Sequence, residues 1–161
     1  MFASRIARGA AAGVLLLTMA GLGSSCSKDA DRVERLYAEY RKDFPAVTGI
    51  SASDLQREIA ERPLVLVDTR TPEEQLVSKI PGAVSRQDFD DRREFYRDAS
   101  IVAYCTVGAR SGRFAAELTS EGFEVRNLEG GILAWTHIGG PLVDPQGPTR
   151  KVHVYGRRWN L

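Results

Sequence analysis

The 161 residues of this chain have room for one domain of ordinary size together with short terminal segments. Hydrophobic residues make up 43% and charged residues 27%, a composition that excludes a largely disordered chain. The net charge is +1; Arg5 and Arg8 are the charged residues of the first 26, and subtracting these two charges leaves −1 for the remainder. A nearly neutral domain excludes nucleic-acid binding as the main function, because phosphate binding needs an excess of positive charge.

Residues 1–26 have the pattern of an export signal. Arg5 and Arg8 form a positive region, and the apolar run over 10–22 is as long as a signal-peptide core but shorter than a membrane-spanning helix. The letters LGSSC at 22–26 resemble a bacterial lipobox, whose cysteine becomes the lipid-modified first residue; cleavage after Ser25 is the alternative. We therefore expect export to the bacterial periplasm or cell envelope, with a membrane anchor through a lipid on Cys26.

Residues 27–46 are expected to form a helix and a linker ahead of the domain. Apolar side chains recur there at helical spacing and give one apolar face, formed by Val33, Leu36, Tyr37, Tyr40 and Phe44. Pro45 ends the pattern. We interpret this segment as a helix that packs on the domain behind it, and a partner-binding helix is the alternative.

Residues 47–143 alternate between short apolar runs and amphipathic segments. The expected strands are 48–50, 64–67, an edge strand from Val84, 101–104 and 123–127. The expected helices start at Ser51 or Ser53, at Thr71 (where TPEE is a helix start), at Asp88 (88–98, with Phe89 and Phe95 as anchors), at Ser111 and at Gly131. This alternation predicts an α/β domain with a mainly parallel sheet.

Residues 144–161 form a tail that is basic after its first residue. No acid follows Asp144, whereas the tail contains Arg150, Lys151, Arg157 and Arg158. The letters VHVY at 152–155 could add an edge strand. An ordered or frayed terminus is our interpretation, and contact with phospholipid or an acidic partner is the alternative.

Cysteine and histidine are scarce in the chain. The cysteines are Cys26 and Cys105, without a Cys-x-x-Cys pair, and the histidines are His137 and His153. Zinc sites need several such ligands at short spacing. We therefore expect no metal and no other cofactor, and we assign the two histidines no role.

The segment 101–118 reads as a buried strand, a polar loop and an amphipathic helix, with Cys105 where the strand ends. There the N–H groups of the loop and the positive end of the helix can converge on the sulfur and favour the nucleophilic thiolate. Gly108 permits a tight curl, and Arg110 has the planar donor geometry that suits an oxyanion. A small buried hydrophobe is the alternative for an isolated cysteine, but the surrounding loop favours a reactive one.

The letters CTVGARS at 105–111 resemble the active loop of single-domain rhodaneses, which are sulfurtransferases. Three further stretches resemble motifs of that family in the same order: DTR at 68–70, IPGA at 80–83 and LEGGILAW at 128–135. Lys79 stands where many members have a histidine before the IPGA turn. The resemblance implies a rhodanese-like three-layer α/β fold for residues 47–143, with helices on both sides of a mainly parallel sheet.

The length of the loop separates two related chemistries. The sulfurtransferases close the loop as Cys-x4-Arg, whereas the related cell-cycle phosphatases and arsenate reductases use Cys-x5-Arg. Arg110 lies in the shorter register from Cys105, and Ser111 occupies the longer one. This count favours sulfur transfer over phosphate or arsenate chemistry.

The resemblance implies a two-step sulfur transfer through Cys105. The thiolate takes the outer sulfur of a small anionic donor such as thiosulfate, and a thiol or other thiophile then unloads the persulfide. The expected substrate-binding residues are Thr106, Val107, Gly108, Ala109 and Arg110, and the expected structural residues near the site are Asp68, Arg70 and Ser111. The alternative is a membrane-anchored module that uses the same fold for binding or sensing without catalysis.

Overall fold

A five-stranded sheet forms the centre of the computed structural model, which describes residues 24–154. The strand order is β1-β5-β4-β2-β3, and each neighbouring pair runs parallel. The strands are β1 (Thr48–Ile50), β2 (Val65–Asp68), β3 (Val84–Ser85), β4 (Ile101–Tyr104) and β5 (Val125–Leu128). The predicted parallel sheet is therefore confirmed, and the strand bounds differ from the prediction by at most two residues.

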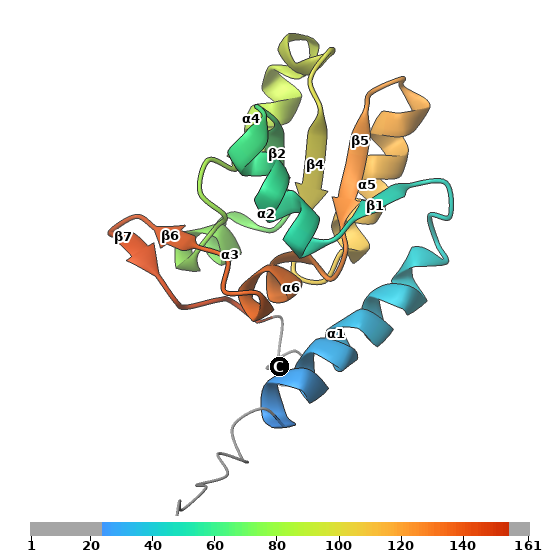
Figure 1. Cartoon of the computed structure of the whole chain (residues 1–161). Helices are drawn as coiled ribbons and strands as arrows, with labels where there is room; N and C mark the ends of the chain where they lie inside the picture. Colours follow the sequence, from blue (N-terminus) through green and yellow to red (C-terminus); the bar gives the residue numbers. More distant parts are fainter. Residues whose placement is uncertain (1–23, 155–161) are drawn as a thin grey trace, which may run out of the picture.

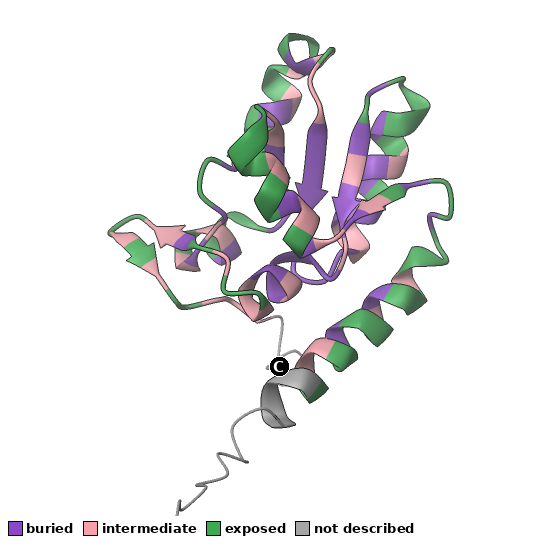
Figure 2. Cartoon of the chain, viewed as in Figure 1, coloured by how far each residue is buried: buried purple, intermediate pink, exposed green. Residues whose placement is uncertain are grey.

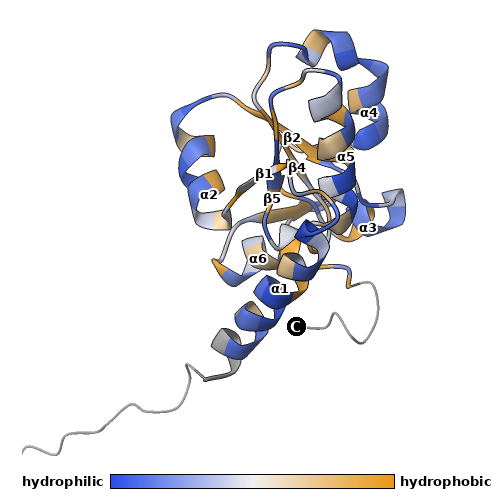
Figure 3. Cartoon of the chain, turned by 90° about the vertical axis from the view of Figure 1, so that its right-hand side faces the viewer, coloured by the Kyte–Doolittle hydropathy of each residue, from blue (hydrophilic) through white to orange (hydrophobic). Residues whose placement is uncertain are grey.

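Helices cover both faces of the sheet (Figures 1 and 3), so the predicted three-layer α/β architecture is confirmed. In Figure 3, α2 lies on one side of the strands and α4 and α5 on the other. The helices are α1 (Ser24–Arg41), α2 (Ala52–Glu61), α3 (Pro72–Val77), α4 (Arg86–Asp91), the 3₁₀ helix η1 (Arg93–Tyr96), α5 (Ala109–Ser120) and α6 (Gly131–His137). Two further strands, β6 (Leu142–Asp144) and β7 (Gly147–Thr149), form an antiparallel pair.

The helix starts follow from their capping residues. The Ser51 hydroxyl accepts a hydrogen bond from the Asp54 N–H and caps α2. Thr71 and Glu74 form a complete capping box at α3, with Pro72 at the start of the helix. The sequence-based prediction of both starts is confirmed.

Strand β4 is buried on both faces and supplies the centre of the core (Figure 2). Because side chains alternate along a strand, Ile101 and Ala103 pack with α4 and α5, whereas Val102 and Tyr104 pack with α2 and α6. The run IVAY therefore serves two cores at once. A strand with apolar residues on both faces is what a central parallel strand requires.

The prediction of one helix over 88–98 with two phenylalanine anchors is wrong in part. Helix α4 ends at Asp91, and η1 follows it. Phe89 is fully buried and stacks on Tyr96 at 5.3 Å between ring centroids, whereas Phe95 is 83% exposed. The break at Arg92 and the tighter winding of η1 turn Tyr96, and not Phe95, toward Phe89 and the core.

Helix α1 lies beyond the ends to which the strands point, next to α5 and α6 (Figures 1 and 3). The predicted packing of this segment on the domain is confirmed by Val33, Tyr37 and Phe44, which are buried. Between residues 24 and 154, no helix combines the length and the apolar character that a bilayer crossing requires. Of the export signal predicted over 1–26, residues 1–23 and the side chain of Cys26, the predicted lipid attachment site, lie outside the described residues.

Residues 152–154 do not form a strand, and Tyr155, the last residue of the strand considered for 152–155, lies outside the described residues. Residues 150–154 have no regular secondary structure, and the strand pair β6–β7 precedes them. Val152 and Val154 instead pack against the buried cluster of Val33, Val107 and Leu133. Side-chain packing on α1, α6 and the cysteine loop therefore replaces strand pairing as the contact that holds this part of the tail.

Candidate active site

Cys105 follows the last residue of β4 and is 1% exposed. The loop after it curls so tightly that the backbone N–H of Gly108 donates to the Cys105 sulfur at 3.2 Å. Gly108 has φ of +100°, and a side chain there would meet the Tyr37 ring at 2.7 Å. The prediction that this loop needs a residue without a Cβ is confirmed.

A buried carboxylate fixes the cationic side of the loop. Arg110 donates from Nη1 to Glu74 Oε2 at 2.7 Å and from Nη2 to Glu74 Oε1 at 2.9 Å. The Thr106 hydroxyl bridges the same pair, donating to Glu74 and accepting from Arg110, both at 3.1 Å. This two-pronged geometry holds the guanidinium in one orientation beside the sulfur.

The electrostatics of the pair favour its charged state. Burial would raise the pKa of Glu74, but the hydrogen bonds from Arg110, Thr71 and Thr106 outweigh it and lower that pKa from 4.5 to about 2. The Glu74 hydrogen bonds in turn raise the pKa of Arg110, against the effect of burial, and the nearby Cys105 sulfur adds to the rise. The Arg110 charge that faces Cys105 is therefore permanent and balanced by a permanent carboxylate.

The start of α6 fixes the opposite side of the loop. The N–H of Ile132 donates to the Cys105 carbonyl at 2.8 Å, and the N–H of Leu133 donates to the Thr106 carbonyl at 3.2 Å. A Cβ on Gly131 would collide with the Cys105 carbonyl oxygen, and Gly131 has φ of +58°. The loop carbonyls are thereby held against α6.

Asp68 and Arg70 form a fully buried ion pair behind the loop. Arg70 Nη2 donates to Asp68 Oδ2 and to the Ser78 carbonyl, both at 2.6 Å. Burial opposes the charge of Arg70, but the pairing with Asp68 outweighs it and raises the pKa of Arg70. The pair joins the end of β2 to the residue that follows α3, and α3 carries Glu74.

Ser111 and Asn127 connect the loop to β5. The Ser111 hydroxyl donates to Asn127 Oδ1 at 2.7 Å, and Asn127 Nδ2 donates to the Gly108 carbonyl at 2.9 Å. Both side chains are fully buried. The sharp turn of the loop at Gly108 is thus anchored to the neighbouring strand of the sheet.

A cavity of about 240 Å³ opens above the sulfur. Its lining comes from the loop and α5, together with one residue of α1: Cys105, Thr106, Val107, Ala109, Arg110, Arg113 and Tyr40. Ligand pockets for drug-sized molecules run from about 300 Å³ upward, so this cavity suits a small ligand. Of the residues that we expected to bind substrate, Gly108 is the one that is not in the lining.

Sequence reasoning assigned Glu74 only to a helix start and gave Tyr40, Arg113 and Asn127 no place in the site. His153, which we had assigned no role, places its Nδ1 3.9 Å from Glu74 Oε1. The partners of these residues lie far away in the sequence, so local spacing carries no signal for them.

Among the described residues, no group of three or more His, Cys, Asp or Glu side chains could hold a metal ion.

A parallel α/β domain that presents one cysteine in a tightly curled loop at the carboxyl end of its sheet defines a class of thiol-based transferases and hydrolases. Within that class, residues 51–138 match the model of the rhodanese-like domain. The chain belongs to the rhodanese-like family.

Relatives and solved structures agree with this assignment. The chain is 37% identical over 106 residues to a sulfurtransferase of Allochromatium vinosum, covering 63% of this chain and 99% of that protein. It is 36% identical over 90 residues to a putative sulfurtransferase, YtwF, of Bacillus subtilis, covering 53% of this chain and 87% of that protein. The crystal structure of a rhodanese-related protein from Thermoplasma volcanium superposes with a TM-score of 0.54 at 26% identity, covering 60% of this chain and 97% of the other.

Proposed function

We propose that this protein is a sulfurtransferase that carries a sulfane sulfur on Cys105. The observation that carries the proposal is the Cys105 sulfur at the floor of a small cavity, with the Gly108 N–H directed at it. Arg110, oriented by Glu74, adds a fixed positive charge beside the sulfur. Kinship with sulfurtransferases supports the same chemistry.

In the first step the Cys105 thiolate attacks the outer sulfur of thiosulfate. A new sulfur–sulfur bond forms to Cys105, the bond between the two donor sulfurs breaks, and its electron pair leaves with sulfite. The product is a persulfide anion on Cys105. Hydrogen-bond donors that point toward this anion lower the energy of the transfer, as an oxyanion hole does.

In the second step a thiophile attacks the outer sulfur of the persulfide. With cyanide, a carbon–sulfur bond forms, the persulfide bond breaks, and the products are thiocyanate and the Cys105 thiolate. Among the side chains that the structure describes, Cys105 is the free cysteine. In this proposal a separate molecule unloads the persulfide, and a thiol can take the place of cyanide.

Mass spectrometry of the Cys105 peptide after incubation of the full chain with thiosulfate tests this proposal. We expect one added sulfur atom on that peptide, none in Cys105→Ser, and normal loading in the matched variant Cys26→Ser. Absence of an adduct from thiosulfate, polysulfide and a low-molecular-weight persulfide would contradict the proposal. Measurable hydrolysis of an aryl phosphate would point instead to phosphatase chemistry.

The alternative of a binding or sensing module predicts a different result in cells. Under that alternative, Cys105→Ser complements a deletion strain fully, because binding needs the surface and not the thiol. Sulfur transfer predicts that the variant fails although the protein accumulates normally. The packing of α1 and the tail on the cysteine loop supports the catalytic proposal, because it gives both segments a role at the site.

We further propose that the protein acts in the bacterial cell envelope, anchored by a lipid on Cys26. The support is the positive region, the apolar run and the LGSSC letters of residues 1–26. Metabolic labelling with a fatty acid tests it: the wild-type chain should carry label in the membrane fraction and Cys26→Ser should not. Unlabelled wild-type protein in the soluble periplasmic fraction would favour simple cleavage after Ser25.

A further inference from the structure

The cavity above Cys105 contains two arginines whose charges are balanced to different extents. Arg110 is held by two hydrogen bonds to Glu74, a carboxylate that is 3% exposed. Arg113 has a single contact, at 3.2 Å, to Asp43, and both of these side chains are more than half exposed. Arg110 is therefore held in place by a buried carboxylate, whereas Arg113 can exchange its exposed partner for a bound anion.

The two arginines share one side of α5 and one cavity with Cys105. Arg110 and Arg113 lie three positions apart in the first part of α5, so both project on the same side of the helix. Both line the cavity that Cys105 also lines. A small anion in this cavity can therefore contact the cysteine loop and Arg113 together.

The opposite wall of the cavity belongs to α1, which the rhodanese-like match over 51–138 does not include. Tyr40 lines the cavity from this helix, and Asp43 lies in the turn that follows the helix end at Arg41. The segment is fixed on both sides of them, because Tyr37 and Phe44 are buried. The ring of Phe44 lies so close to Gly112 of α5 that any Cβ there would collide with it.

Building on the proposed sulfurtransferase function, we propose that Arg113 and Tyr40 form an outer anion subsite that selects the donor. Arg113 binds the charged end of a small anionic sulfane-sulfur donor, such as the sulfonate group of thiosulfate, and Tyr40 bounds the space that this end occupies. Asp43 holds Arg113 in the absence of a donor and competes with it. The subsite favours small anionic donors over neutral ones of the same size.

Alkylation of Cys105 by iodoacetate and by iodoacetamide tests the subsite independently of sulfur transfer. In both reactions the sulfur forms a bond to carbon and iodide leaves, and the reagents differ in a carboxylate against a neutral amide. In Arg113→Gln we expect the iodoacetate rate to fall about tenfold relative to the iodoacetamide rate, the range for a hydrogen bond to a charged group. Peptide mass spectrometry of the full chain reads both rates at Cys105.

Initial rates of persulfide formation give the second readout. Arg113→Gln should raise the half-saturating thiosulfate concentration about tenfold and leave the maximal rate within about twofold, because its charge acts on binding and not on the transfer. Arg113→Lys should recover part of the loss, and Asp43→Asn should lower the half-saturating concentration. Added salt should shrink these differences, because the site is open to solvent.

Arg57→Gln is the matched control. Arg57 on α2 has the same exposure as Arg113, 62%, and the same kind of exposed partner, Asp54. An unchanged reagent ratio in Arg113→Gln, or an equal change in Arg57→Gln, would overturn the subsite. A wild-type protein that is alkylated with the expected selectivity but never loads sulfur would overturn the proposed function instead.

Discussion

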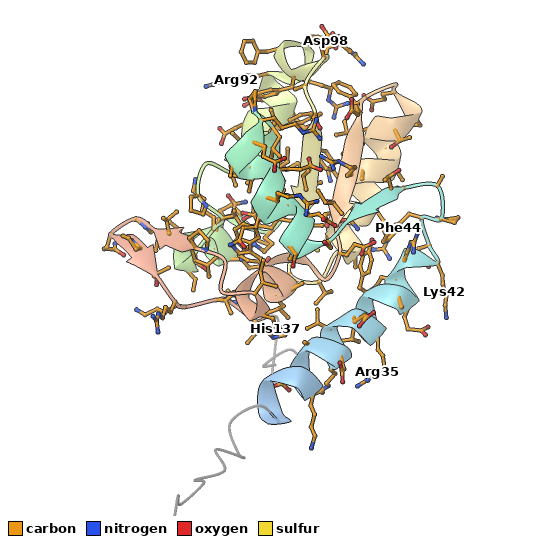
Figure 4. The ribbon with its side chains drawn as sticks, in the orientation of Figure 1. Arg35, Lys42, Phe44, Arg92, Asp98 and His137 are labelled. Atoms are coloured by element: carbon orange, nitrogen blue, oxygen red, sulfur yellow. The ribbon has the colours of Figure 1, made fainter. Side chains whose placement is uncertain are left out.

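The two ends of the parallel sheet carry the same kind of ion pair, but the two carboxylates have different surroundings. At the carboxyl end, Arg110 meets a Glu74 carboxylate that is 3% exposed, beside the nucleophile. At the amino end, Arg93 meets Glu121 at 2.6 Å, and this carboxylate is 41% exposed. Figure 4 marks this second end by Arg92 and Asp98, far from α1.

The two pairs differ in how strongly they restrict the arrangement of charges around them. An exposed pair is screened by water and contributes little to stability, whatever its distance. The Glu74 carboxylate has lost most of its hydration, so its charge depends on the hydrogen bonds from Arg110 and Thr106. The carboxyl end of this sheet therefore has one allowed arrangement of charges, whereas the amino end tolerates many.

The largest expected difference between the two ends comes from removing one carboxylate at each. Glu74→Gln should lower the free energy of unfolding by about 2–3 kcal/mol, because the change replaces the charged hydrogen bonds between Arg110 and a buried carboxylate by weaker ones to a neutral amide. Glu121→Gln should cost less than about 1 kcal/mol. Equilibrium denaturation in urea measures both values, and equal losses would refute the contrast between the ends.

Lowering the pH should remove the stabilising effect of the Glu74–Arg110 pair from the wild-type protein. The pKa of Glu74 is lowered from 4.5 to about 2. The ionised carboxylate therefore stabilises the folded protein fully above pH 4.5, and this stabilisation is lost as the pH falls toward 2. The loss should amount to roughly 3 kcal/mol over that range. Between pH 5 and pH 2, the free energy of unfolding of Glu74→Gln should depend less steeply on pH than that of the wild type. Parallel profiles for the two proteins would contradict the lowered pKa of Glu74.

Two glycines with positive φ, one at each end of the sheet, allow a second comparison of the two ends. Gly131→Ala should cost about 2–4 kcal/mol, because left-handed strain adds to a collision with the Cys105 carbonyl. Gly122, which follows α5 at the amino end, has φ of +86° with no atom within 4 Å of an added Cβ. Gly122→Ala should therefore cost only about 1 kcal/mol. Thermal or urea unfolding measures both losses. A Gly122 variant as unstable as the Gly131 variant would show that backbone strain, and not the collision of the added Cβ, causes the loss.

The smallest effect should come from Phe95, at the amino end. Phe95→Ser should change the free energy of unfolding by less than about 0.5 kcal/mol, because the ring is 83% exposed. A loss above about 1 kcal/mol would restore Phe95 as the anchor that the sequence indicated. Denaturation in urea alongside the wild type measures this change.

Local patterns were sufficient for most of the fold. Apolar runs located the strands, and the capping residues Ser51 and Thr71 located two helix starts, because both signals depend on neighbours within a few residues. The same locality explains the error at Phe95, where a continuous helix was assumed across the break at Arg92. The 3₁₀ winding of η1, which places Tyr96 and not Phe95 in the core, leaves no signal in that local pattern.

The sequence predicted only those parts of the site whose residues lie close together in the chain. Cys105, Gly108 and Arg110 belong to one loop, so their spacing carries information about its shape. Glu74 precedes Arg110 by 36 positions, and its capping bond to Thr71 already accounted for it as a local feature. Contacts between distant segments depend on how the layers pack, and neither periodicity nor spacing records that packing.

The two hydrogen bonds from α6 to the Cys105 and Thr106 carbonyls have a consequence for how the protein is made. Synthesis proceeds from the amino terminus, so β4 and α5 leave the ribosome before α6 exists. Until Ile132 and Leu133 arrive, the loop lacks the two donors that bind its carbonyls. A nascent or truncated chain that contains Cys105, Arg110 and Glu74 would therefore hold the loop less firmly, and the loop would reach its final shape when the last helix docks.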